Sequence, residues 1–281
     1  MKPILKILKV GLSCTFQDRG RKGLQQYGVS YGGYLDPIAA HHVALRSGSD
    51  VLLESTYAGI NLQALEECLL IISGIGIEID GKKKSGFQVI ELKLKIDQAV
   101  KIRSQGAVFY VGSTAEFHVA KTLGSASTHR PAMLGNPPLE AGDVLYKKSV
   151  KIRQFISSTI KPPLYKSFHI PILPGPEHSL LTPEQKKELE EKKWTISSLS
   201  DRMATQFSEQ LEEGILYSMI SSPVLPGTIQ YTPSGKLIVL MVDGQTIGGY
   251  PRVGMLAEGD RIILAQKRAG EMITLNFLEN E

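Results

Sequence analysis

Apolar and charged residues alternate with a period of two over residues 90–96, and three other segments are short, nearly continuous apolar runs. A period of two predicts a half-buried strand, and short apolar runs predict strands buried on both faces. The apolar runs cover residues 69–73, 107–111 and 237–242. A further strand is predicted over residues 1–10, and Asp80-Gly81 predicts a tight hairpin between two strands.

Helix signals are fewer than strand signals. Asp36 before Pro37 predicts an N-cap and a first-turn proline for a helix over residues 38–46. Thr182 and Gln185 form a capping-box pattern for a polar helix that ends near Lys193. A third helix is predicted over 259–266, with Ile262, Ile263 and Ala265 facing inward. The predicted fold class is therefore mainly β with a few helices.

The two halves of the chain contain similar short segments in the same order. Residues 15–19, 59–63, 69–73 and 141–145 have counterparts in residues 198–202, 227–230, 237–242 and 269–273. Such ordered similarity predicts two related β-rich lobes. We place the lobes at residues 1–160 and 161–281, with an approximate boundary that leaves room for interleaving.

Composition is ordinary for a globular protein: 281 residues, 42% hydrophobic and 21% charged, with a net charge of +4. Lysines alternate with glutamates instead of forming a basic stripe, which argues against nucleic-acid binding. No apolar stretch is long enough for a membrane span, and residues 1–10 lack the uninterrupted apolar region of a signal peptide. Cys14 and Cys68 are expected to be inert core residues, so the expected location is a reducing cytoplasm.

Several common motifs are missing from the sequence. Neither Gly81-Lys82 nor Gly235-Lys236 continues as a phosphate-binding loop, and Gly74-Ile75-Gly76 lacks the third glycine of a dinucleotide fingerprint. The adjacent His41 and His42 have the wrong spacing for two ligands of one metal. The sequence therefore predicts no metal site.

The segment 243–252 is a glycine-rich polar loop directly after an apolar run. Glycines allow close backbone approach, and amide, hydroxyl and guanidinium groups can together recognise a planar amide or ureido group. We therefore predict a ligand-binding loop, whose polar members are Gln245, Thr246, Tyr250 and Arg252.

Three other polar clusters have both a functional and a structural interpretation. Gln17, Asp18 and Arg21 could hold a carboxylate or phosphate, or they could form an ion pair that stabilises a turn. Asp201 and Arg202 have the same two interpretations. Glu54 could be a buried proton-transfer group or, more commonly, a hydrogen-bonded structural glutamate.

These clusters, taken in order, resemble the biotin-dependent carboxyltransferase-like family, which includes the C subunit of 5-oxoprolinase, allophanate hydrolase subunit 2 and the carboxyltransferase part of urea carboxylase. The resemblance runs from about Gly11 to Phe277. Its first half rests on Thr15-x-Gln17-Asp18-x-Gly20-Arg21, Glu54-x-Thr56-x-x-Gly59 and Leu123-Gly124-Ser125. Its second half rests on Ser200-Asp201-Arg202-Met203, Pro226-Gly227-Thr228-Ile229-Gln230 and Gln245-Thr246-x-Gly248-Gly249-Tyr250-Pro251-Arg252.

The resemblance implies two cyclophilin-like β-barrel lobes and companion B and A subunits. It further implies that the chain is the C subunit of an ATP-dependent 5-oxoprolinase, which converts 5-oxo-L-proline to L-glutamate. ATP would be bound by the complex, since no ATP-binding motif is evident in this chain. The catalytic residues carried over are Gln245, Tyr250, Arg252 and Asp201. The substrate-binding residues are Thr246, Gly248, Gly249, Arg202, Gln230, Gln17, Asp18, Arg21 and Glu54.

Two alternatives remain open. The first is a carboxyltransferase acting on urea or a similar amide, with carboxybiotin supplied by another chain because no Met-Lys-Met biotinylation segment occurs here. The second is a non-catalytic regulator that binds a companion B-type subunit and antagonises a kinase inhibitor. It is suggested by departures from the family pattern in the first half, such as Val43-Ala44, Ser113-Thr114 and Ala126.

Overall fold

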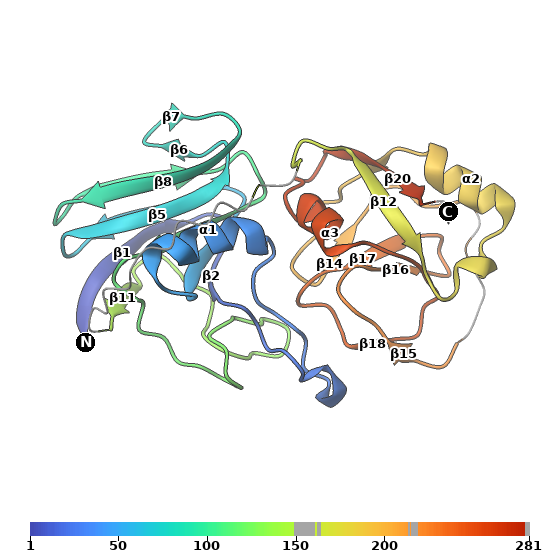
Figure 1. Cartoon of the computed structure of the whole chain (residues 1–281), viewed down its shortest axis with the longest axis horizontal. Coiled ribbons are helices and arrows are strands. Elements are labelled where there is room, and N and C mark those ends of the chain that lie inside the picture. The colour runs from blue at the N-terminus through green and yellow to red at the C-terminus, as the bar shows by residue number, and fades with distance from the viewer. Residues whose placement is uncertain (149–160, 162–163, 213, 215–218, 279–281) are drawn as a thin grey trace. The chain divides into compact units, whose positions relative to one another are not determined.

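The fold is mainly β, as the computed structural model of the chain shows (Figure 1). The structure describes residues 1–148, 161, 164–212, 214 and 219–278. Strand conformation accounts for 38% and helix for 13%, and the curled sheets are consistent with half-barrels. The prediction of a mainly β chain with a few helices is confirmed.

The chain divides into two compact units. The first unit contains Met1–Arg21 and Gly32–Pro162, and the second contains Lys22–Tyr31 and Pro163–Glu281. A short segment of the first half, residues 22–31, thus belongs to the second unit. The predicted boundary between residues 160 and 161 involves residue 160, which lies outside the described residues, so its position stays a prediction.

The first unit contains two sheets. The six-stranded sheet has the order β11-β1-β4-β9-β6-β7 and the five-stranded sheet the order β2-β3-β10-β5-β8. All of their strand pairs are antiparallel. The strands are Lys2–Val10 (β1), Ser13–Gln17 (β2), Leu52–Thr56 (β3), Ile60–Ala64 (β4), Cys68–Ile75 (β5), Glu78–Ile79 (β6), Lys82–Lys83 (β7), Phe87–Leu94 (β8), Ala99–Arg103 (β9), Val108–Ser113 (β10) and Val144–Lys147 (β11).

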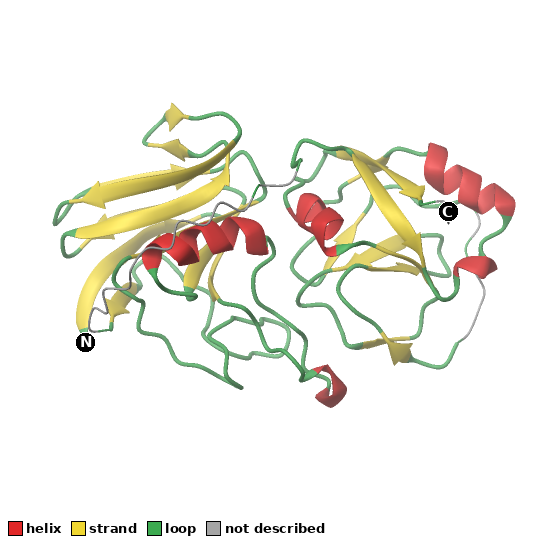
Figure 2. Ribbon diagram, in the orientation of Figure 1, coloured by secondary structure: helices red, strands yellow, loops and turns green. Residues whose placement is uncertain are grey.

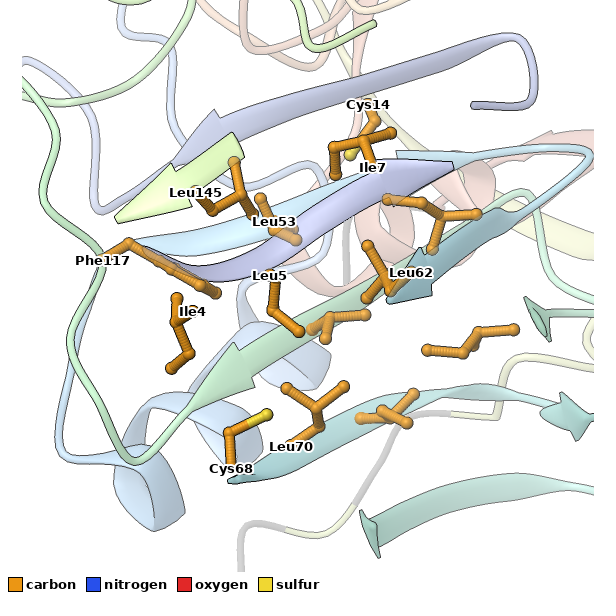
Figure 3. Packing of buried hydrophobic residues seen from close by; sticks show 14 of the residues in the cluster. Ile4, Leu5, Ile7, Cys14, Leu53, Leu62, Cys68, Leu70, Phe117 and Leu145 are labelled. Atoms are coloured by element: carbon orange, nitrogen blue, oxygen red, sulfur yellow. The ribbon is translucent and has the colours of Figure 1, made fainter. Parts of the chain in front are cut away.

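Apolar side chains from both sheets form the core of the first unit (Figure 3). Leu5 and Ile7 of β1 and Leu62 of β4 are fully buried with Leu53 of β3 and Leu70 of β5. Because side chains alternate across a strand, each sheet presents its apolar face to this core. Cys14 and Cys68 are buried free thiols, and burial raises the pKa of both, that of Cys68 to about 11.

The helix Pro37–Ser47 (α1) lies against β5 and β10 of the first unit. Figure 2 shows it as the long red ribbon beside the sheets of this unit. Asp36 caps it as predicted, since its carboxylate accepts hydrogen bonds from the backbone N–H groups of Ile38 and Ala39. A Cβ added to Gly112 of β10 would lie 2.6 Å from a methyl carbon of Val43. Glycine at this position therefore allows the helix to approach the sheet, and β10 is buried on both faces.

The second unit contains a seven-stranded sheet and a separate two-stranded sheet. The seven-stranded order is β13-β20-β12-β19-β16-β17-β14, in which β12 and β20 are parallel, and the two-stranded sheet pairs β15 with β18. The strands are His169–Pro174 (β12), Trp194–Thr195 (β13), Ala204–Gln206 (β14), Ser222–Pro223 (β15), Thr228–Tyr231 (β16), Leu237–Leu240 (β17), Ile247–Gly248 (β18), Arg252–Met255 (β19) and Met272–Phe277 (β20).

The helices of the second unit are Pro183–Glu191 (α2) and Glu258–Ala265 (α3), and the short 3-10 helices of the chain are Gln25–Tyr27 (η1) and His178–Leu180 (η2). The predicted capping box of α2 is present, although the helix ends at Glu191 rather than near Lys193. In α3 the expected inward Ala265 is only half-buried, and Leu264 is buried instead. Within the described ranges, no helix combines the length and apolar character that a bilayer span requires.

Two of the predicted internal similarities share backbone geometry. Gly142 and Gly270 have positive φ angles of 103° and 87°. The N–H of Gly142 donates to the carbonyl of Ile7, and the N–H of Gly270 donates to the carbonyl of Ile196. In return, the N–H of each isoleucine donates to the carbonyl of the residue after the glycine, Asp143 or Glu271. Gly59 and Gly227, with φ angles of 90° and 99°, likewise precede β4 and β16.

The counterpart of residues 15–19 does not share secondary structure. Residues 15–17 belong to β2, whereas residues 198–199 form a turn. Asp18 and Asp201 nevertheless each accept a hydrogen bond from the backbone N–H two residues further on, of Gly20 and Met203. The similarity between the halves therefore lies in the glycine turns and in these aspartate turns, and not in the strand conformation of residues 15–17.

Candidate functional site

The polar loop 243–252 joins β17 to β19 in the second unit and contains β18. Gln245 is exposed, and its Nε2 donates a 3.0 Å hydrogen bond to Oε1 of Gln230 on β16. Gln230 is 1% exposed. The buried amide therefore orients the exposed one, and the structure brings these two predicted residues together.

Gly248 lies directly beside the Gln230 amide. A Cβ at position 248 would lie 2.3 Å from Nε2 of Gln230, which is closer than any real contact allows. At Gly249 the nearest atom to an added Cβ is Oγ of Ser221, at 3.6 Å. Only the first of the two predicted glycines is therefore required by close packing.

An ion pair fixes the beginning of the loop. Nε and one terminal nitrogen of Arg202 donate to the two carboxylate oxygens of Asp243 at 2.8 and 2.9 Å. Asp243 is 2% exposed, and its backbone N–H also bonds the carbonyl of Arg202. This two-point geometry gives Arg202 a structural role in holding the loop.

The hydroxyl of Ser30 supports the same position from residues 22–31. It is buried and donates a 2.7 Å hydrogen bond to the carbonyl of Gly244, the residue before Gln245. Ser30 belongs to the second unit although 214 positions separate it from Gly244 in the chain. No sequence signal pointed to this contact.

Arg252, at the end of the loop, is held by Glu177. The two side chains form a two-point pair with distances of 2.8 and 2.6 Å, and the third guanidinium nitrogen donates to the carbonyl of Pro223 at 3.0 Å. The hydrogen bond from Arg252 lowers the pKa of Glu177 and the pair raises the pKa of Arg252. All three nitrogens of this predicted catalytic residue thus have protein partners.

The remaining predicted residues of the second unit differ in their surroundings. Tyr250 is 43% exposed, and Thr246 is partly exposed with its carbonyl bonded to the N–H of Val224. Asp201 is exposed and accepts hydrogen bonds from the backbone N–H groups of Met203 and Ala204. Asp201 therefore shapes a turn, whereas Tyr250 and Thr246 are accessible to a ligand.

In the first unit, Gln17, Asp18 and Arg21 form one buried cluster with residues 125–128. Asp18 accepts hydrogen bonds from the Ser125 hydroxyl at 2.5 Å and from the Ala126 N–H at 2.7 Å. Arg21 donates to the carbonyls at positions 122 and 127, and Gln17 bonds the Thr128 carbonyl and the Ser127 hydroxyl. These bonds attach the segment 125–128 to the end of β2 and to the residues directly after it, which is the structural interpretation of the cluster.

Glu54 forms a different set of bonds. Its Oε2 accepts from the Tyr110 hydroxyl at 2.6 Å and from the Leu35 N–H at 3.0 Å, and the same hydroxyl accepts from the Asp36 N–H. Burial and the Glu54 charge raise the pKa of Tyr110. Glu54 thus fixes the chain entering α1, so its observed contacts match a hydrogen-bonded structural glutamate.

The resulting site is suited to binding rather than to acid–base chemistry. The groups that remain accessible in the loop are the amide of Gln245, the phenol of Tyr250 and Thr246. Uncharged donors and acceptors on a framework of fixed ion pairs suit a planar, neutral ligand such as an amide. The sequence missed Glu177 and Ser30, because their partners are far away in the chain.

These features belong to a known class of domain. The chain is a member of the family described as "Carboxyltransferase domain, subdomain A and B", whose model matches residues 27–277.

Among its relatives are two proteins named as the C subunit of 5-oxoprolinase, from Haemophilus influenzae and Escherichia coli. Each is 30% identical over 279 residues, which cover 96% of this chain and 90% of the relative. The fold is also similar to that of Kluyveromyces lactis urea carboxylase, with a TM-score of 0.83. That match has 21% identity and covers 99% of this chain and 28% of the other, so it shows the fold alone.

Proposed function

We propose that this chain is the C subunit of an ATP-dependent 5-oxoprolinase complex that hydrolyses 5-oxo-L-proline to L-glutamate. The observation that carries the proposal is the 30% identity to the C subunits of two 5-oxoprolinases over 96% of the chain. The accessible amide of Gln245 adds support, because a lactam is a planar amide that can exchange hydrogen bonds with it.

The proposed complex contains companion B and A subunits and acts in the cytoplasm. ATP, bound by the complex, supplies the phosphoryl group that activates the lactam oxygen. This chain's contribution is to bind and orient the lactam through Gln245, Thr246 and Tyr250, while Arg252 and Arg202 keep the loop in place through Glu177 and Asp243.

The test is glutamate formation from 5-oxo-L-proline by the reconstituted complex, with and without this chain. The proposal predicts turnover that requires ATP, both companion subunits and this chain. Equal turnover without this chain would contradict it. If the chain binds the companion B-type subunit but leaves turnover unchanged, the non-catalytic regulator becomes the better account.

A second candidate is a carboxyltransferase acting on urea or a similar amide, and the family model itself favours it. Carboxybiotin would then be delivered by another chain. Transfer of labelled carboxylate from carboxybiotin to urea, dependent on this chain, would select this function over the lactam hydrolase.

A further inference from the structure

Two of the buried polar atoms around the β15–β18 pair have no hydrogen-bond partner among the described residues. They are Nε2 of Gln230 and Oγ of Ser222. A buried donor without an acceptor is costly, and most buried polar groups in proteins are paired. Both atoms are therefore available to an acceptor that enters from outside.

The two donors lie on the same side of the β15–β18 pair. Ser222 of β15 is the cross-strand partner of Gly248 on β18, and directly opposed residues of an antiparallel pair point to the same face. A Cβ at Gly248 would point at Nε2 of Gln230, 2.3 Å away. Ser222 Oγ and Gln230 Nε2 thus both lie beneath the strand pair near Gly248.

The strand pair that covers the donors is small. Each strand has two residues, no third strand of the described chain joins them, and Ile247 is 61% exposed. Besides the backbone ladder between β15 and β18, two hydrogen bonds involve the pair or its flanking residues. One runs from Arg252 to the Pro223 carbonyl and the other from the Val224 N–H to the Thr246 carbonyl. The ion pairs of Asp243 and Arg252 hold the two ends of the loop, whereas the two-residue strand pair lies between those ends. An isolated two-stranded pair is only marginally stable and can be displaced at low cost.

We infer that Gln230 and Ser222 form the oxygen-binding part of the site and donate hydrogen bonds to the carbonyl oxygen of the ligand when the β15–β18 pair is displaced. A carbonyl oxygen has two lone pairs and can accept both bonds. Gln245 keeps the Gln230 amide oriented through the bond to its Oε1. This assignment rests on the proposed function, because it takes the ligand to be a lactam.

Ser222→Ala tests the inference on the full-length chain, with Ser221→Ala, an exposed neighbouring serine, as the matched control. Binding of 5-oxo-L-proline and of L-proline, which lacks the lactam oxygen, is measured by isothermal titration calorimetry. Loss of one hydrogen bond should weaken 5-oxo-L-proline binding roughly three- to tenfold without changing L-proline binding. The melting temperature should not fall, because the removed hydroxyl has no partner in the described structure.

Any one of three results would overturn the inference. The first is unchanged affinity of Ser222→Ala for 5-oxo-L-proline, and the second is a lower melting temperature that accounts for its weaker binding. The third is a wild type that binds 5-oxo-L-proline no more tightly than L-proline. Turnover by the complete complex combined with any of these results would leave the proposed function standing. Selective binding that depends on Ser222, without turnover by the complete complex, would instead overturn the proposed function.

Discussion

At the scale of single residues, the charged and uncharged members of the loop have different tasks. Arg202 and Arg252 are each held by two hydrogen bonds to a carboxylate, of Asp243 and Glu177. Guanidinium groups bound in this way serve as fixed supports. Recognition of a neutral ligand then falls to groups such as the amide of Gln245.

The adjacent glycines 248 and 249 provide a matched pair for a packing test. Gly248→Ala should displace the Gln230 amide and lower the free energy of unfolding by about 1–3 kcal/mol, because the added Cβ overlaps Nε2. Gly249→Ala should change it by less than about 0.5 kcal/mol, because the nearest atom, Oγ of Ser221, lies at an ordinary contact distance of 3.6 Å. Urea denaturation measures both, and equal effects of the two substitutions would show that Gly248 is not packed against Gln230.

His178, next to Glu177, should make stability depend on pH. Burial lowers its pKa below the ordinary value of 6.5, and Lys186 lowers it further while Glu190 opposes the shift. Its ring also packs against Phe277 at 4.4 Å between centroids. As the pH falls below about 6.5, the unfolded chain binds a proton at this residue more readily than the folded chain, so stability decreases.

Comparison with His178→Gln isolates this contribution. The free energy of unfolding, measured by denaturation between pH 5 and pH 8, should fall more steeply toward low pH in the wild type than in the variant. Parallel curves for the two proteins would contradict the assignment of the pH dependence to His178.

At the scale of elements, short sequence motifs correctly predicted where two helices begin and where one hairpin turns. The cap at Asp36, the capping box at Thr182 and the Asp80-Gly81 hairpin all depend on side-chain and backbone groups within a few residues. Contacts set by tertiary packing were not predictable in this way. The parallel pairing of β12 with β20 and the Glu177–Arg252 pair connect segments far apart in the sequence.

The segment 22–31 should help to position the candidate loop. Ser30→Ala removes the buried bond to the Gly244 carbonyl and should lower the free energy of unfolding by about 0.5–1.5 kcal/mol. Hydrogen–deuterium exchange should become faster in residues 243–248 and remain unchanged in the first-unit sheets. Ser208→Ala, at an exposed serine of the second unit, is the control. Faster exchange in both variants, or in neither, would argue against a positioning role.

At the scale of the whole molecule, alternation and apolar runs were sufficient to predict a mainly β chain, because burial on one or both faces of a strand leaves a direct pattern in the sequence. The candidate site was predicted less completely. The position of Gln245 on a loop after a buried strand was readable, but the burial of Gln230 and the partners of both arginines depend on how distant strands pack.

The division of roles between the two units is the central prediction for the molecule. The polar cluster around Asp18 and Arg21 in the first unit is expected to support a backbone segment, and the Gln245 loop in the second unit is expected to bind the ligand. Conservative substitutions at Asp18 or Arg21 should therefore lower the free energy of unfolding more than they weaken ligand binding by the folded protein.

A crystal structure of the full-length chain, assembled with its companion subunits and soaked with 5-oxo-L-proline, tests this division most directly. We expect the lactam within hydrogen-bond distance of the Gln245 side chain in the second unit. A lactam held by Asp18 and Arg21 in the first unit, with the Gln245 loop unoccupied, would contradict the assignment.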